Sequence, residues 1–147
     1  DFIKKLNIKL DIKFNDESDF ERIAQMTEKT NQFNFNKNIF SKNDILTWVN
    51  NKNYIYSLKV TDKFGDYGTV GLILVKLKNK NAVIENFLMS CRALGKKTEN
   101  TFFQHVLDDL DEKNIKLESI LFKETNKNIP VKQFINNNKY ENYLRKI

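Results

Sequence analysis

Apolar residues recur along the chain with two different spacings, which predict an alternation of strands and helices. In "NIKLDIKF" (residues 7–14) every second residue is apolar, which is the period of a strand with one buried face. In "FERIAQMTEK" (residues 20–29) the apolar residues share one face of a helix. The polar "TNQFNFNKN" (residues 30–38) sustains neither period, and "SKNDILTWVNN" (residues 41–51) predicts a short helix capped by Ser41.

The second part of the chain continues this alternation. Residues 54–90 predict three antiparallel strands joined by "DKFGDYG" and "KNKN", and residues 96–113 predict the longest helix. A strand over 116–124, a short helix over 129–138 and a last strand over 139–147 follow. Strands adjacent in sequence tend to pair, so the order β α α β β β α β α β predicts an α/β fold with a mixed, mostly antiparallel central sheet and flanking helices.

The length and composition indicate one domain. The 147 residues include one proline and four glycines, so no linker divides residues 1–147, and no apolar run approaches the roughly 20 residues that a membrane span needs. The start "DFIKKLNIKLDIKF" has no initiator methionine and no signal-peptide pattern. We therefore expect a fragment of a longer cytoplasmic protein, with no membrane partner.

The ionisable residues exclude several classes of site. One cysteine cannot form an internal disulfide, and one histidine, His105, is too few for a Cys/His zinc site, so no metal is expected. The formal charge is +6, but the basic residues are scattered along the chain. We therefore expect no nucleic-acid partner.

The stretch "ENFLMSCRALGKKTE" (residues 85–99) carries the strongest candidate for anion binding. If a helix begins near Gly95, the backbone N–H groups of residues 95–98 lack intrahelical partners and carry the positive end of the helix dipole. Arg92 and Lys96 or Lys97 would add charge, and Gly95 allows close approach of the backbone. This arrangement would hold a phosphate.

Two residues in the same stretch are candidates for catalysis. The positive field would favour the thiolate form of Cys91, which a nucleophile requires, although a lone cysteine at the end of an apolar strand is also typical of a core residue. Glu85 lies among apolar neighbours and could act as a base, or it could form a salt bridge at the edge of a strand. His105 lies more than a helical turn away and is expected to be a surface or partly packed histidine.

The segments "RIAQMTEKTNQFNFN", "SLKVTDKFGDYGTVGLILV", "IENFLMSCRALGKKTE" and "ETNKNIPVKQFINNNKYE" resemble, in order and spacing, the C-terminal portion of FkbH-like proteins. The resemblance covers almost the whole chain. It implies a GNAT-like acyltransferase fold that follows an N-terminal HAD-type phosphatase-like domain of the same full-length protein. It also implies handling of a glyceryl unit, passed as a thioester to the phosphopantetheine arm of an acyl carrier protein for polyketide and related assembly.

The resemblance also implies roles for individual residues. Cys91 matches the cysteine of the Ser-Cys-Arg motif and would carry a transient acyl thioester. The pantetheine arm and its phosphate would be held by Arg92, Gly95, Lys96, Lys97, Thr98 and Asn128. The hydroxyl groups of a small polyol acid would be bound by Thr30, Asn31, Gln32 and Asn34, although this loop could equally be a turn that satisfies its own backbone.

Three functional hypotheses remain open. The first is the glyceryl or acyl transferase in which Cys91 takes the acyl group. The second is a coenzyme A dependent N- or O-acetyltransferase that needs no thiol and uses Glu85 or an ordered water as base. The third is a non-catalytic module that docks the carrier protein, for which the positive charge would speed encounter with an acidic partner.

Overall fold

The computed structural model of the protein describes residues 7–94 and 97–147. The strands are β1 (Lys9–Phe14), β2 (Phe33–Asn34), β3 (Tyr54–Asp62), β4 (Gly65–Lys78), β5 (Asn81–Met89), β6 (Lys116–Phe122) and β7 (Leu144–Lys146). The α-helices are α2 (Phe20–Lys29), α3 (Lys42–Asn50), α4 (Cys91–Leu94), α5 (Glu99–Glu112) and α6 (Ile129–Asn138), and the 3-10 helices are η1 (Glu17–Asp19) and η2 (Glu141–Tyr143).

The described strands form one mixed sheet in the order β1-β3-β4-β5-β6-β7, with β2 paired to β5. All pairs from β1 to β5 are antiparallel, and β5–β6 and β6–β7 are parallel. This confirms the predicted α/β fold with a mostly antiparallel central sheet and flanking helices. The connection from β5 through α5 to β6 supplies the crossover that a parallel pair requires.

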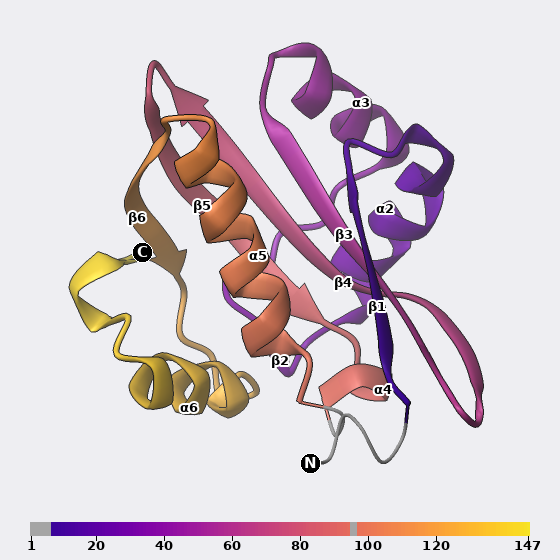
Figure 1. Ribbon diagram of the computed structural model, residues 1–147. Helices are drawn as coiled ribbons and strands as arrows, with labels where there is room; N and C mark the ends of the chain where they lie inside the picture. Colours follow the sequence, from indigo (N-terminus) through magenta and orange to yellow (C-terminus); the bar gives the residue numbers. More distant parts are fainter. Residues whose placement is uncertain (1–6, 95–96) are drawn as a thin grey trace.

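Helices cover both faces of the sheet (Figure 1). On one face, α2 and α3 pack their apolar residues against Ile55, Leu72, Leu74 and Leu88. On the other face, α5 and α6 pack against a larger core that contains Ile73, Val75 and Phe87. Neighbouring residues of β4 thus point to opposite faces, as the period of a strand requires.

Capping residues explain where the first helices begin. The side chain of Asp16 accepts a hydrogen bond from the Ser18 backbone N–H and so starts η1, which leads directly into α2. At α3, Ser41 and Asp44 form a capping box, with each side chain accepting from the backbone N–H of the other. The predictions of a helix over residues 20–29 and of Ser41 as a cap are confirmed.

The helix predicted from residue 96 begins later. Helix α5 starts at Glu99, and Lys97 adopts a left-handed φ of 57°, which a continuous right-handed helix cannot include. The four residues Cys91–Leu94, which follow β5 after Ser90, form the separate helix α4. The predicted helix start near Gly95 was therefore wrong, and Gly95 and Lys96 themselves lie outside the described residues.

The strand β2 was not predicted, and it lies where the parallel strands β5 and β6 no longer pair. The parallel strands β5 and β6 pair only from Asn81 to Ile84 on β5. Beyond that point β2 pairs with the end of β5, and Phe35 accepts a hydrogen bond from the backbone N–H of Lys123, just after β6. The chain therefore fills the opening between its own two parallel strands.

The described helices include none that is both long enough and apolar enough to cross a bilayer.

Candidate functional site

Cys91 lies at the point where β5 turns into α4. The backbone N–H of Ser90 bonds to Val70 on β4, and Cys91 then begins the helix. Its thiol is exposed, and Sγ lies 3.8 Å from Oε1 of Gln32, within the range of a weak S–H···O hydrogen bond. The interpretation of Cys91 as a buried core residue is therefore wrong.

The loop from Thr30 to Asn36 divides into an inner and an outer part. Asn34 is 1% exposed, and its amide donates to the Thr30 carbonyl while its Oδ1 accepts from the Asn36 backbone N–H. Thr30 is also buried, whereas Asn31 and Gln32 are exposed. Of the four residues predicted to bind substrate hydroxyl groups, Asn31 and Gln32 are accessible and Gln32 lies next to the thiol, whereas Thr30 and Asn34 hold the loop together.

Asn128 has no polar atom left for a ligand. Its Nδ2 donates to the carbonyls of Asn34 at 3.1 Å and Lys123 at 2.9 Å, and its Oδ1 accepts from the Thr125 backbone N–H at 2.9 Å. Its side chain is 1% exposed. Asn128 therefore fastens β2 to the loop before α6, which is a structural role distinct from the predicted contact with a pantetheine arm.

The first turn of α5 carries a carboxylate of its own. Glu99 is partly buried, and burial raises the pKa of its carboxyl group even though the backbone N–H groups of Glu99 and Thr98 favour the charged form. Thr98 is fully buried, and Lys97 is exposed. A phosphate at these amides would have to displace the Glu99 carboxylate, so this turn is a poor match to the predicted phosphate site. Arg92, in α4, is exposed and available.

Glu85 lies apart from the thiol. It is partly buried on β5, where the side-chain amide of Asn36 donates to its backbone carbonyl at 3.0 Å and lies 3.5 Å from its Oε2. Four residues of extended strand, roughly 13 Å, separate Glu85 from Met89 at the end of β5. The structure therefore does not bring the two candidate catalytic groups, Glu85 and Cys91, together.

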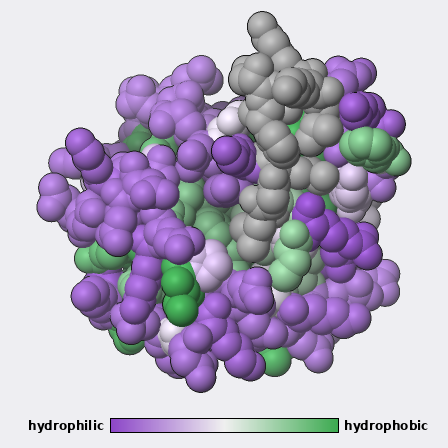
Figure 2. Space-filling view, turned by 90° about the horizontal axis from the view of Figure 1, so that it is seen from below, coloured by the Kyte–Doolittle hydropathy of each residue, from purple (hydrophilic) through white to green (hydrophobic). Residues whose placement is uncertain are grey.

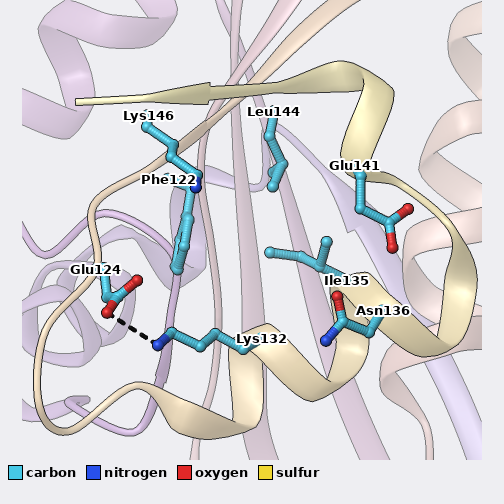
Figure 3. Close-up of a pocket in the computed structure, with 8 residues that line it drawn as sticks. All are labelled: Phe122, Glu124, Lys132, Ile135, Asn136, Glu141, Leu144 and Lys146. Carbon is cyan, nitrogen blue, oxygen red and sulfur yellow. Dashed lines mark ion pairs between the residues drawn. The ribbon is translucent and has the colours of Figure 1, made fainter.

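The pocket in Figure 3 lies elsewhere in the fold, between β6, α6, η2 and β7, with a volume of about 420 Å³. Phe122, Ile135 and Leu144 form its apolar wall, and Lys132 points toward Glu124, with which it forms an ion pair at 2.9 Å. None of the predicted site residues lines it. Across residues 7–94 and 97–147, no group of His, Cys, Asp and Glu is arranged to hold a metal ion.

Arg22 and Lys59 were not predicted to belong to a site, yet both line a second pocket together with Arg92. These residues come from α2, β3 and α4, and no local pattern connects them. The available signal was the rarity of arginine, of which the chain has three among 25 basic residues.

No family model and no curated protein matches the sequence. Solved structures do match. An aminoglycoside acetyltransferase from an uncultured soil metagenomic sample, in complex with sisomicin, aligns with a TM-score of 0.58 and 12% identity over 93% of this chain and 90% of that one. A Trypanosoma brucei acetyltransferase aligns with a TM-score of 0.53 and 12% identity over 86% of this chain and 91% of that one.

The ribosomal-protein-S18-alanine N-acetyltransferase from Escherichia coli aligns with a TM-score of 0.56 and 9% identity over 73% of this chain. The alignment spans 63% of the length of that enzyme. At such identities the likeness shows the fold alone. The protein thus has the GNAT acetyltransferase fold.

Proposed function

We propose that this GNAT-fold domain is an acyltransferase that handles a small acyl unit, a glyceryl unit by its resemblance to FkbH-like proteins, as a thioester for transfer to an acyl carrier protein. The observation that carries the proposal is the exposed thiol of Cys91 beside Gln32. In the full-length protein, the N-terminal HAD-type domain would supply the phosphatase chemistry, and a cytoplasmic carrier protein would be the partner.

The transfer step needs no metal. The thiolate of the phosphopantetheine arm attacks the carbonyl carbon of the acyl group carried on Cys91, forming a new C–S bond. The bond from that carbon to the Cys91 sulfur breaks, and this sulfur leaves as a thiolate and takes up the proton that the arm released. Exchange between two thioesters is reversible, so a loaded carrier protein also acylates Cys91 by the reverse of this step. Asn31 and Gln32 carry neutral amides that bind hydroxyl groups of the acyl unit.

The arm would approach from the surface. Strand β2 pairs with the end of β5, so the backbone hydrogen-bonding groups on that edge of β5 are already occupied. They cannot bind the two amide groups of a pantetheine arm. The thiol of Cys91 is exposed, so the arm can reach it from the surface without inserting beside β5. The exposed Arg92 and Lys97 lie close to Cys91 in sequence and would receive the phosphate of the arm.

Intact-protein mass spectrometry after incubation with acyl-loaded carrier protein tests the proposal. One acyl mass should appear on the wild type and none on Cys91→Ala. Gln32→Ala, which keeps the thiol, should slow acylation without abolishing it. If the acyl group leaves the carrier protein and no acyl mass appears on Cys91 at any time, the proposal is wrong.

A coenzyme A dependent N- or O-acetyltransferase is the second candidate, supported by the acetyltransferases that share the fold. Glu85 would then be the base, and the Asn36 amide beside its Oε2 would orient it. Turnover of acetyl-coenzyme A should survive Cys91→Ala and fall in Glu85→Gln. The reverse pattern favours the thiol mechanism.

A non-catalytic docking module is the third candidate, supported by the net charge of +6. Binding of the carrier protein should then weaken steeply with salt, while Cys91→Ala changes nothing and coenzyme A gives no thermal shift. Acylation of the thiol would exclude this candidate.

A further inference from the structure

A pocket of about 450 Å³ lies between α2, β3, β4 and α4. We call it the arginine pocket, and the residues that line it are Asp19, Arg22, Lys59, Tyr67, Gly68, Thr69 and Arg92. Figure 2 shows the molecule from the end at which α4 lies, and that face is mainly hydrophilic with scattered apolar side chains. Charged and polar side chains make up most of the lining of the pocket itself, so a polar ligand suits it better than an apolar one.

The choice of arginine in this pocket is informative. The chain uses lysine for nearly all its positive charges, and only three of its 25 basic residues are arginines. Two of the three, Arg22 and Arg92, line the arginine pocket although they come from helices far apart in sequence. The guanidinium group presents a rigid fork of donors that matches two oxygens of a phosphate or carboxylate, which the ammonium group of lysine cannot do.

Within the described part of the chain, the cations of the pocket form no ion pair with a carboxylate. The ion pairs found there are Lys13–Asp11, Lys113–Asp109 and Lys132–Glu124, none of which includes Arg22, Lys59 or Arg92. Lys59 does act on Asp16 from further away: the hydrogen bond from Ser18 lowers the pKa of that carboxyl group most, and the charge of Lys59 lowers it further. Three like charges around one pocket repel one another, so a bound anion would stabilise the arrangement.

Asp19 is the one carboxylate among the residues that line the pocket. It is 8% exposed, and its Oδ2 accepts a hydrogen bond of 2.7 Å from the Thr69 hydroxyl, so its charge is held at the buried side of the pocket. Three cations and one carboxylate leave a net charge of +2. Gly68 has no atom within 4 Å of the place where a Cβ would stand, which leaves open space on that wall.

We propose that the arginine pocket binds the phosphate group of a small phosphate monoester. A phosphate monoester carries a charge close to −2 at neutral pH and offers three acceptor oxygens, which matches the net charge and the two guanidinium forks. A carboxylate carries half that charge and binds more weakly. This proposal goes beyond acyl transfer and does not depend on the Cys91 thiol, although the pocket shares Arg92 with the contact proposed above for the phosphate of the arm.

Titration with methyl phosphate, followed by backbone amide chemical shifts, tests the proposal. We expect saturable shifts at residues around the pocket and a Kd that rises with salt, because the cations are partly exposed. Acetate, the carboxylate probe, should bind at least about tenfold more weakly. Equal binding of acetate and methyl phosphate would overturn the assignment to phosphate, and shifts that never saturate would overturn the site.

Charge-matched variants separate the pocket from the general positive charge of the protein. Arg22→Gln and Lys59→Gln should each weaken binding by about tenfold or more. Arg145→Gln removes the third arginine, which is exposed on β7 outside the pocket, and should leave Kd unchanged. If Arg145→Gln weakens binding as much as Arg22→Gln, the effect is one of net charge and the proposal fails.

Two controls keep the outcome interpretable. Arg22 and Lys59 are only partly buried, so Arg22→Gln and Lys59→Gln should both keep the wild-type urea midpoint. Weaker phosphate binding in both variants at an unchanged midpoint would then not be due to a folding defect in either one. Cys91→Ala should bind methyl phosphate like the wild type. Failure of acyl transfer and failure of phosphate binding are therefore distinguishable.

Discussion

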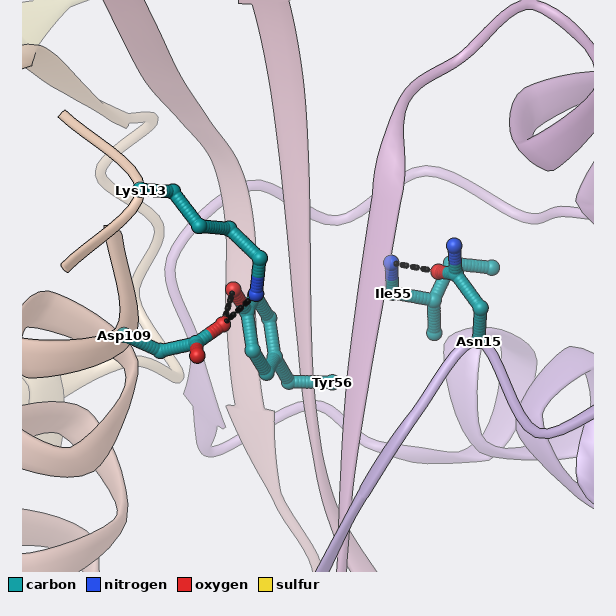
Figure 4. A network of polar contacts seen from close by, with 5 residues as sticks. All are labelled: Asn15, Ile55, Tyr56, Asp109 and Lys113. Atoms are coloured by element: carbon teal, nitrogen blue, oxygen red, sulfur yellow. Dashed lines mark hydrogen bonds and ion pairs between the residues drawn. The ribbon is translucent and has the colours of Figure 1, made fainter. Parts of the chain in front are cut away.

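The hydroxyl group of Tyr56, on β3, donates a hydrogen bond to the carboxylate of Asp109, on α5, and joins the sheet to that helix (Figure 4). Lys113, which follows the helix, forms an ion pair with the same carboxylate. Tyr56 is 1% exposed, while Asp109 and Lys113 reach the surface in part. In the same region, Asn15 accepts a hydrogen bond from the Ile55 backbone N–H at 2.8 Å, which ties the end of β1 to β3.

Stability should depend on Tyr56 at alkaline pH. Burial raises the pKa of Tyr56 above its ordinary value of 10.0, and the hydrogen bond to Asp109 raises it further. The unfolded tyrosine ionises near pH 10 while the folded one stays neutral, so this contribution to stability is complete below pH 10 and is lost as the pH rises. Urea denaturation at about pH 7, 9 and 11 should show Tyr56→Phe less stable by about 1 kcal/mol at neutral pH, with a shallower decline above pH 10.

Tyr143→Phe is the matched control for this prediction. Tyr143 is 42% exposed on η2, so its replacement should leave both the stability and its alkaline decline close to those of the wild type. If Tyr56→Phe and Tyr143→Phe decline with the same slope, Tyr56 is not the group responsible.

Asn128 should be needed for the stability of the fold rather than for ligand binding. Replacement by alanine removes three hydrogen bonds and leaves the carbonyls of Asn34 and Lys123 without that donor, at a cost of about 2–4 kcal/mol. Asn128→Asp should cost more, because a carboxylate would face two carbonyl oxygens. Urea denaturation measures both variants. A wild-type midpoint for Asn128→Ala would show that the side chain is available to a ligand after all.

The sequence predicts elements well where burial repeats locally. Residues 20–29 carry the apolar spacing of α2, and the helix has those bounds because one face packs against β4 and β5. Strand β2 was not predicted because it has only two residues. Its strand conformation depends on pairing with Leu88 and Met89, which are far away in sequence. The alternation of Phe33 and Phe35 with asparagines was the available signal, masked by the polar composition around it.

The candidate site was predictable in part. The resemblance placed Gln32 and Cys91 in one site, and the structure brings their side chains to within 3.8 Å. It did not anticipate the left-handed backbone at Lys97, which is uncommon for a residue other than glycine and which separates α4 from α5. Nor does a single sequence tell whether a polar side chain such as Asn128 faces a ligand or the carbonyls of its own chain.

Gly71 should not tolerate a methyl group. A Cβ there would lie 2.6 Å from Sδ of Met89, 3.1 Å from Cε2 of Phe102 and 3.2 Å from Cβ of Leu58, all of them fully buried. Gly71→Ala should therefore lower the free energy of unfolding by about 1–3 kcal/mol. Replacing a glycine in a strand by alanine usually has the opposite effect and raises the free energy of unfolding.

A double-mutant cycle identifies the cause of that loss. Met89→Val removes the sulfur that the new methyl group meets, so Gly71→Ala should cost less in the Met89→Val background than in the wild type. Additive losses would mean that the sulfur contact is not what excludes alanine.

The Cys91 thiol should react in the native protein. Because its side chain is exposed, iodoacetamide should add one carbamidomethyl group without denaturant, at a rate that low urea concentrations leave unchanged. A buried thiol would react only through unfolding, and its rate would rise with urea. Mass spectrometry of the intact protein over time, with Cys91→Ser as the unreactive control, measures the rate. Protection that persists until the unfolding transition would contradict the exposed position and remove the basis for acyl transfer at this sulfur.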